Sequence, residues 1–292
     1  MSPRDILLAL LVVALWGMNF AAAKIGLREF PPMFMMFLRF TAVAAILLPF
    51  VKVPRDKLPG IALLSLILGT VHFPLMFTGI SGLDAATASV VAQLQVPFAS
   101  LLAAVFFKDM LGWQRASGMA VAFAGVALIA GEPRLDGSLD SLLMVVAAAL
   151  AFAGANVQIK RLGSVDGYAL NAWMGLFAAP QLLVLSLLLE DGQWAALTGA
   201  GLAGWGALAY IVVAATIVAY GLWYGLMRRN DVNQAVPYML LVPVFGVLSG
   251  VVALDETLTW TLVIGGLLTV AGVAIITLIR PKVVNEKVSN PT

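Results

Sequence analysis

Ten long apolar segments constrain the fold of this chain more than any other feature. They cover roughly residues 5–27, 33–51, 59–80, 84–107, 113–131, 140–160, 168–189, 201–228, 231–254 and 257–280. A helix needs about 20 apolar residues to cross the hydrocarbon core of a bilayer. A membrane β-strand is about half that length and alternates between lipid and lumen. The segments match the helix, so the sequence predicts an all-α integral membrane protein with ten transmembrane helices.

The composition leaves too little charge for a surface exposed to water. Hydrophobic residues make up 62% of the 292 residues and charged residues 11%, and the mean hydropathy is +1.00. A soluble domain carries about 25% charged residues. The first apolar segment continues to about Ala23 with no small-residue cleavage site before a polar region, so we expect a retained helix and not a cleaved signal peptide.

Several classes of function are disfavoured by what the sequence lacks. The net charge is only +2, which gives no reason to expect a nucleic-acid partner. The sequence has no cysteine and a single histidine, His72, so we expect no disulfide and no metal site. It has no Walker A loop for ATP, and no carboxylate pair or nucleophile–base set within a segment. We therefore expect no catalytic residue, no cofactor and no enzyme activity.

Basic residues alternate with the apolar segments. If the N-terminus is cytoplasmic, thirteen lysines and arginines fall on the cytoplasmic side and three fall outside. The cytoplasmic set is Arg4, Lys52, Arg55, Lys57, Lys108, Arg115, Lys160, Arg161, Arg228, Arg229, Arg280, Lys282 and Lys287, and the external set is Lys24, Arg28 and Arg134. This is the bias expected of a membrane protein. It predicts that both termini are cytoplasmic, and the compact loops and short tails suggest a bacterial inner (plasma) membrane.

The two halves of the chain repeat one another. Three residue types recur 146 or 147 positions apart, in the pairs Pro97 and Pro243, Asp109 and Asp255, and Trp113 and Trp260. Five helices per half is an odd number, so the second half crosses the membrane in the opposite sense. Inverted repeats of this kind are typical of secondary transporters with a site at the midplane. We expect a first five-helix repeat over 1–131, an external loop over 132–139, a second, inverted repeat over 140–280 and a cytoplasmic tail over 281–292.

Several motifs together resemble the drug/metabolite transporter superfamily in its EamA branch. They are "ALWGMNF" (14–20), "PPMFMMFLRF" (31–40), "VAFAGVALIAG" (121–131) and the two L-x-V-P steps ending at Pro97 and Pro243. The chain is also similar to bacterial aromatic amino-acid exporters of the YddG type. The resemblance covers nearly the whole chain. It implies ten helices, a central cavity lined by helices 1, 3, 4, 6, 8 and 9, peripheral helices 5 and 10, and export of small metabolites.

Polar and aromatic side chains within these helices are the candidate cavity residues, because their burial in lipid needs a reason. Amides both donate and accept, and aromatic rings suit a mainly apolar metabolite. Gln93 and Gln95 point about 200° apart on one helix, so only one faces the cavity, and we select Gln95. The candidate substrate-binding set is Trp16, Asn19, His72, Met76, Gln95, Asn156, Tyr220 and Tyr238.

Three basic residues within the segments need an interpretation. His72 could contact the substrate, act as a proton switch, or be a hydrogen-bonded buried residue. Arg39 could clamp a carboxylate with its planar fork, or be structural, which we favour because helix 2 is expected to be peripheral. Lys24 lies at a helix end and is expected to be an interfacial anchor.

The two repeated prolines are candidate hinges. Pro97 and Pro243 remove helical hydrogen bonds to the carbonyls of Gln93 and Met239. The resulting bends could move during alternating access, or could be static kinks that shape the cavity.

The sequence as a whole favours a secondary carrier that exports amino acids, aromatic or hydrophobic ones first, or related neutral or zwitterionic metabolites. No acid lies near the middle of a segment, which argues against cationic drugs. An exporter of drugs or other metabolites and a passive facilitator or channel remain alternatives. The expected partners are the small-molecule substrate and the lipid bilayer. Glycines at i and i+7 (Gly118 with Gly125, Gly265 with Gly272) suit close helix packing and would also suit a homodimer.

Overall fold

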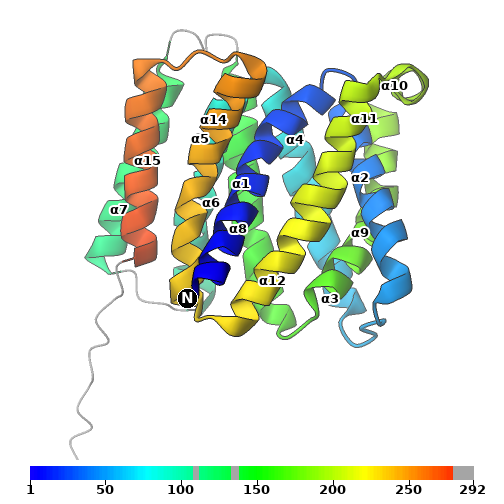
Figure 1. The fold of residues 1–292 in the computed structure, drawn as a ribbon, viewed down its shortest axis with the longest axis horizontal. Coiled ribbons are helices and arrows are strands. Elements are labelled where there is room, and N and C mark those ends of the chain that lie inside the picture. The colour runs from blue at the N-terminus through cyan, green and yellow to red at the C-terminus, as the bar shows by residue number, and fades with distance from the viewer. Residues whose placement is uncertain (108–111, 133–137, 279–292) are drawn as a thin grey trace, which may run out of the picture.

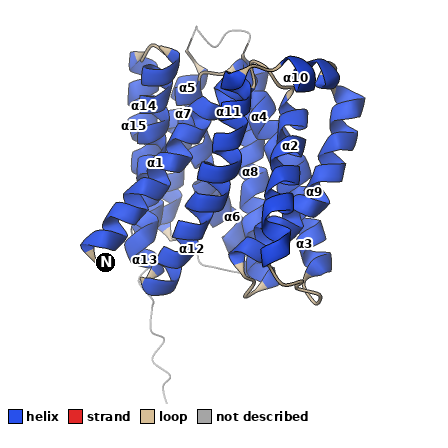
Figure 2. Ribbon diagram, turned by 45° about the vertical axis from the view of Figure 1, so that its right-hand side comes forward, coloured by secondary structure: helices blue, strands red, loops and turns tan. Residues whose placement is uncertain are grey.

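The computed structural model describes residues 1–107, 112–132 and 138–278. Within these ranges the chain forms helices, turns and loops and contains no strand (Figures 1 and 2). Ten of the helical stretches are long and apolar enough to cross a membrane. In chain order these spans 1 to 10 are Pro3–Gly26, Pro32–Phe50, Leu58–Gly82, Ala85–Phe106, Trp113–Ala130, Leu139–Leu162, Gly167–Leu189, Leu202–Arg229, Pro237–Leu254 and Trp260–Leu278. The predicted fold class is confirmed.

Several spans are built from more than one helix. The α-helices are α1 (Pro3–Gly26), α2 (Pro32–Leu47), α3 (Leu58–Leu64), α4 (Phe73–Gly82), α5 (Ala85–Val91), α6 (Gln95–Phe107), α7 (Trp113–Ala130), α8 (Leu139–Leu162), α9 (Gly167–Leu189), α10 (Gln193–Gly199), α11 (Leu202–Ala209), α12 (Ala219–Arg229), α13 (Val232–Ala235), α14 (Val242–Leu254) and α15 (Trp260–Leu278). The short helix α10, in the loop between spans 7 and 8, was not expected from the sequence. It is not a span, and its Trp194 is exposed.

The packing of the helices shows the duplication directly. Spans 2 and 7 (α2 and α9) pack together at one edge of the molecule, and spans 5 and 10 (α7 and α15) at the other (Figure 1). Spans 4 and 9 also meet, through α5 and α14. The contact of α1 with α14 has its counterpart in α8 with α6, and that of α4 with α8 in α12 with α1. Exchanging the halves therefore maps the contacts onto one another, as an inverted repeat requires.

The same helix distortions occur in both halves. A π-helical segment interrupts span 3 at Ser65–His72, and a second interrupts span 8 at Tyr210–Val218. A 3₁₀ turn at Ala92–Leu94 precedes α6, and another at Val236–Leu241 precedes α14. π-Helical turns are rare and are often found at functional sites. Their occurrence in both halves makes the middle of spans 3 and 8 a candidate region for the functional site.

Glycine faces join α7 to α15. A Cβ on Gly118 would lie 2.8 Å from the Gly272 carbonyl oxygen, and one on Gly125 would lie 2.5 Å from that of Gly265. The close backbone contact leaves no room for side chains there. These four glycines therefore pack within one chain, so they are not available as the dimer face that the sequence suggested.

Carboxylates cap helix N-termini at one membrane face, which we call the acidic face. Glu190 accepts from the Met33 and Phe34 amides at 2.7 and 3.1 Å, and Glu256 from the Ala85 and Ala86 amides at 2.6 and 2.9 Å. Each carboxylate satisfies amides that have no partner within their own helix. These contacts tie spans 2 and 7, and spans 4 and 9, together at this face.

Two further charged side chains at the acidic face, Glu29 and Lys24, bond to the backbone at the ends of other helices. Glu29 accepts from the amides of Gly201 and Gly204, and Lys24 donates to the carbonyls of Ile80, Ser81 and Leu83 at 3.1, 2.8 and 2.6 Å. Lys24 therefore caps the end of α4. A helix C-terminus attracts a cation, so the residue has a structural role at a helix end.

At the opposite, basic face, Arg229 pairs with Asp5 at 3.2 Å and ties α12 to α1.

Asp255 is the C-cap of α14 with φ 55°, so it is a helix-end residue. Its repeat counterpart Asp109 lies outside the described residues, as do most of the loop 132–139 and the whole tail 281–292.

Candidate functional site

Arg39 lies at the middle of α2, and its side chain reaches across to span 8. The residue is 5% exposed. Its Nη2 donates to the Thr216 hydroxyl at 3.0 Å, and its Nη1 lies 3.8 Å from the Met36 sulfur. The guanidinium also sits over the rings of Phe73 and Phe40, 4.6 and 5.4 Å from their centroids. The partners of this cation are thus a hydroxyl, a thioether and two aromatic faces.

The part of the chain that the structure describes offers no carboxylate to compensate this charge. Among the described residues, none of the acidic side chains lies within 4.0 Å of the Arg39 guanidinium, and its Nε is buried without a hydrogen-bond partner. An arginine buried in a membrane protein normally pairs with an acid or with backbone carbonyls. The sequence favoured a structural role for Arg39. Among the described residues, however, Arg39 has neither the ion pair nor the carbonyl contacts that a structural arginine normally makes.

Three aromatic side chains of α1 and span 8 form a cluster near this arginine. The Trp16 ring packs edge-to-face on Tyr220 and Trp223, with centroids 5.2 and 5.6 Å apart, and Tyr238 packs against the same apolar cluster. The Trp16 indole donates to the Ala215 carbonyl at 3.0 Å. Tyr220 interacts electrostatically with Arg39. The structure thus brings Trp16 and Tyr220 together near the buried cation, whereas no contact of Tyr238 with Tyr220 or Arg39 is observed among the described residues.

His72 and Met76 both lie on span 3, and His72 contacts span 6. His72 is buried, its Nδ1 lies 2.8 Å from the Ala148 carbonyl, and its ring stands between Phe73 and Phe152. Because a carbonyl only accepts, Nδ1 carries the proton. Met76, one turn further along, is 8% exposed and packs in the main core. His72 is therefore a hydrogen-bonded residue that joins spans 3 and 6, with its Nε2 left for another partner.

The three candidate amides have different environments. Asn19 lies one turn beyond Leu15 and Trp16 on α1, and its Oδ1 is buried with no partner. Gln95 and Asn156 are half-buried on α6 and α8, two helices that pack together. They stay candidates for the cavity wall. The buried amide of Gln158, in contrast, donates to the Gly60 carbonyl at 3.0 Å.

The repeat counterpart of the Arg39–Thr216 contact is a neutral network in span 3. Thr70 lies 146 residues before Thr216. Each threonine hydroxyl contacts the carbonyl five residues earlier in its π-helical segment, at 3.4 Å to Ser65 and at 2.7 Å to Ile211. In the first half, however, the cross-helix partner is Gln181 on α9, which bonds to Thr70 and donates to the Ser65 hydroxyl at 3.0 Å.

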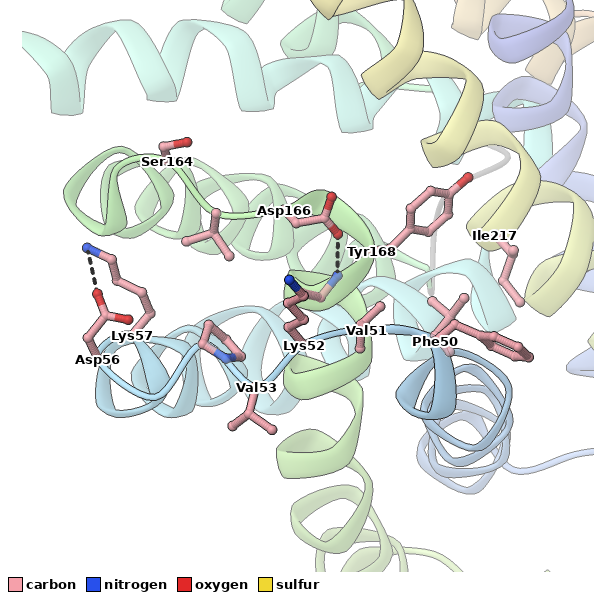
Figure 3. Close-up of a pocket in the computed structure, with 14 residues that line it drawn as sticks. Phe50, Val51, Lys52, Val53, Asp56, Lys57, Ser164, Asp166, Tyr168 and Ile217 are labelled. Atoms are coloured by element: carbon pink, nitrogen blue, oxygen red, sulfur yellow. Dashed lines mark hydrogen bonds and ion pairs between the residues drawn. The ribbon is translucent and has the colours of Figure 1, made fainter.

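A cavity of about 780 Å³ opens at the basic face (Figure 3). It is bounded by the 50–57 loop, the start of α9 and the π-helical segment of span 8. Ile217, which adjoins Thr216, lines it, and so do Tyr168 and two lysines, Lys52 and Lys57. A smaller cavity of about 340 Å³ at the acidic face is lined by Asp84, Asp255 and Glu256. The lining of the larger cavity includes neither Arg39 nor Thr216.

The candidate hinge prolines stand just after the two 3₁₀ turns. Pro97 is the third residue of α6 and Pro243 the second of α14. The Met239 carbonyl accepts a 3₁₀ bond from the Val242 amide, so it is not left free as the sequence suggested. The local breaks are present in both halves. Their movement is a proposal, taken up below.

Sequence reasoning missed Thr216, Phe73 and Gln181. A threonine or phenylalanine in an apolar run gives no polar signal of its own. The two prolines and the two threonines have the same spacing of 146 residues, and this spacing could have identified Thr216 as the repeat counterpart of Thr70. It pairs the two threonines once the halves are aligned.

Comparison with known proteins identifies the family to which this chain belongs. The sequence model of the EamA-like transporter family matches residues 4–131 and 140–278. The chain belongs to this family. A "Probable amino-acid metabolite efflux pump" of Salmonella typhimurium is 34% identical over 285 residues, covering 94% of this chain and 95% of that protein, and its Escherichia coli namesake gives the same values. The "Uncharacterized transporter YoaV" of Bacillus subtilis is 24% identical, covering 90% and 92%.

The same fold occurs in a solved structure. A solved structure, described only as a crystal structure of a protein, superposes on this EamA-like transporter with a TM-score of 0.66 at 22% identity, covering 95% of this chain and 98% of that one. The ten apolar spans and the family together make this chain a multi-pass membrane protein of the drug/metabolite transporter superfamily.

Proposed function

We propose that this protein is a secondary carrier that exports amino acids or closely related zwitterionic metabolites, with a preference for aromatic or hydrophobic side chains. The observation that carries the proposal is the cluster of aromatic and polar side chains at the middle of the spans, around Arg39, Trp16 and Tyr220. Midplane sites between inverted repeats are typical of secondary transporters. The names of the efflux-pump relatives support the same substrate class.

The proposed cavity wall contains the candidate residues together with the contacts that the structure adds. It comprises Trp16, Asn19, Arg39, His72, Met76, Gln95, Asn156, Tyr220 and Tyr238. The charge distribution supports an orientation with both termini in the cytoplasm and the acidic face outside. In a bacterial inner membrane, the larger cavity would then open to the cytoplasm, the side from which an exporter takes its substrate.

Transport into proteoliposomes tests this proposal. Counterflow of labelled phenylalanine, leucine, cysteine, uridine and a cationic dye would be measured with the purified protein. We expect saturable counterflow of the amino acids and little of the nucleoside or the dye. Flux that does not saturate would instead support a channel, and transport of the dye alone would support a drug exporter. Repeating the assay with and without an imposed pH gradient shows whether protons are coupled.

The hinge hypothesis has a separate test. Pro97→Ala and Pro243→Ala restore a backbone donor at each break and straighten the helix. If the breaks bend during transport, we expect the double variant to turn over substrate about tenfold more slowly while binding it normally. A well-folded double variant with unchanged turnover would show that the kinks are static.

A further inference from the structure

The guanidinium of Arg39 has more hydrogen-bond donors than the described residues satisfy. Arginine has five N–H donors. Toward the described residues, one is taken by the Thr216 hydroxyl and one points at the weakly accepting Met36 sulfur. The Nε donor is buried and unpartnered. A buried charge without a counter-ion is costly, so the unused donors suggest that the ligand-free site is incomplete.

The other half of the molecule shows that the fold itself does not need a cation here. At the equivalent π-helical position, Thr70 is bonded by the neutral Gln181, whose amide also reaches Ser65. That network links the same kinds of elements and has its hydrogen bonds satisfied. A glutamine is therefore sufficient to hold an edge helix against a π-helical segment. The positive charge at Arg39 is an addition that the architecture does not explain.

We propose that Arg39 binds the carboxylate of the transported molecule, and that the substrates are therefore carboxylate-bearing molecules with an apolar or aromatic side chain. This proposal rests on the transport function inferred above. The planar guanidinium fork fits a carboxylate. The rings of Phe73, Trp16 and Tyr220 supply an apolar surface beside it.

A second unpartnered atom fits the amino group of such a molecule. Asn19 Oδ1 is a buried acceptor without a donor, and it lies on the α1 face whose Leu15 and Trp16 bond to span 8. Toward the described residues, the Arg39 Nε lacks an acceptor and the Asn19 Oδ1 lacks a donor. An amino acid offers the two missing groups, a carboxylate and an ammonium.

The first test uses the wild-type protein with four probes that share one ring. Binding to purified protein would be measured by thermal stabilisation and by competition with phenylalanine counterflow. L-Phenylalanine and 3-phenylpropanoate carry a carboxylate, whereas L-phenylalaninamide and phenethylamine do not. We expect the carboxylates to bind about 10- to 100-fold more tightly than the two amines, as for a charge-assisted hydrogen bond. Equal binding of phenylalanine and its amide would overturn the proposal.

The second test is Arg39→Gln, which gives this half the side chain that the other half uses. If Arg39 serves a ligand, removing its uncompensated charge should raise the thermal midpoint of the ligand-free protein by a few degrees. It should also abolish the preference for 3-phenylpropanoate over phenethylamine. A structural arginine predicts the reverse, so a lower midpoint or failure to fold would overturn the proposal.

The matched control is Lys24→Gln, which removes another cation from within a span. Lys24 has three carbonyl acceptors, so we expect a lower midpoint and unchanged discrimination between the probes. The two proposals also fail separately. If the wild type transports no amino acid, the transport proposal falls, while probe binding and the stability of Arg39→Gln still decide the role of Arg39.

Discussion

The two π-helical segments have the same local geometry but different partners. In span 3 the Thr70 hydroxyl meets an amide, and in span 8 the Thr216 hydroxyl meets a guanidinium. Both threonines contact the carbonyl five residues earlier. The amide network is satisfied by the protein alone, whereas the guanidinium keeps an unpartnered donor. A duplicated fold thus keeps its backbone distortions in both halves and can specialise one half by changing a single partner.

The strongest way to break this comparison is to place a second arginine at the neutral position. Gln181→Arg puts a cation against Thr70 in a network whose observed partners are the hydroxyls of Thr70 and Ser65. An uncompensated buried charge costs about 3–5 kcal/mol, so we expect a large fall in thermal midpoint or a loss of folded protein. Gln181→Met, which removes the hydrogen bonds without adding charge, is the control. If Gln181→Arg is as stable as the wild type, this position tolerates a bare cation and Arg39 no longer demands an anion.

The second prediction compares the two threonines directly. Thr216→Val removes the hydroxyl that positions Arg39, so we expect the half-saturation concentration for phenylalanine to rise about tenfold. Thr70→Val should lower the free energy of unfolding by about 1 kcal/mol and leave half-saturation unchanged. Counterflow kinetics and thermal melts of both variants give these values. Equal effects on half-saturation would mean that both segments contact the substrate.

The smallest expected effect concerns the bonds that tie each π-helical segment to another span. Trp16 donates to Ala215, and His72 holds Ala148. Trp16→Phe and His72→Phe should each lower the free energy of unfolding by about 1 kcal/mol, because each leaves a carbonyl without its donor. Thermal melts measure this. If His72→Phe abolishes proton-driven transport while its stability matches that of Trp16→Phe, the histidine serves coupling and not only packing.

The sequence anticipated the scaffold closely. All ten spans lie where the apolar segments predicted them, because the bilayer selects for length and hydropathy one segment at a time. The repeat was visible because prolines disrupt helices wherever they occur. Span boundaries differed by a few residues at most sites. The largest difference was in span 9, where α13 and a 3₁₀ turn precede α14.

The candidate site was anticipated less well. Of the eight candidate residues, Trp16 and Tyr220 are in ring contact with each other, and the role of the whole set in substrate binding stays a prediction. Arg39 was assigned to a structural role because its helix was expected at the periphery. The helix does lie at the edge of the molecule (Figure 1), but an arginine side chain is long enough to reach inward from it.

The sequence by itself determined the membrane class, the ten helices, the inverted repeat and the family, because hydropathy, charge bias and repeated motifs act through each segment independently. Only the tertiary structure decided which polar groups meet. The contact of Arg39 with Thr216, the satisfied Gln181 network and the unpartnered Asn19 oxygen depend on how helices far apart in sequence rotate and pack. Hydropathy cannot encode that rotation, since all faces of these helices are apolar enough to meet either lipid or protein.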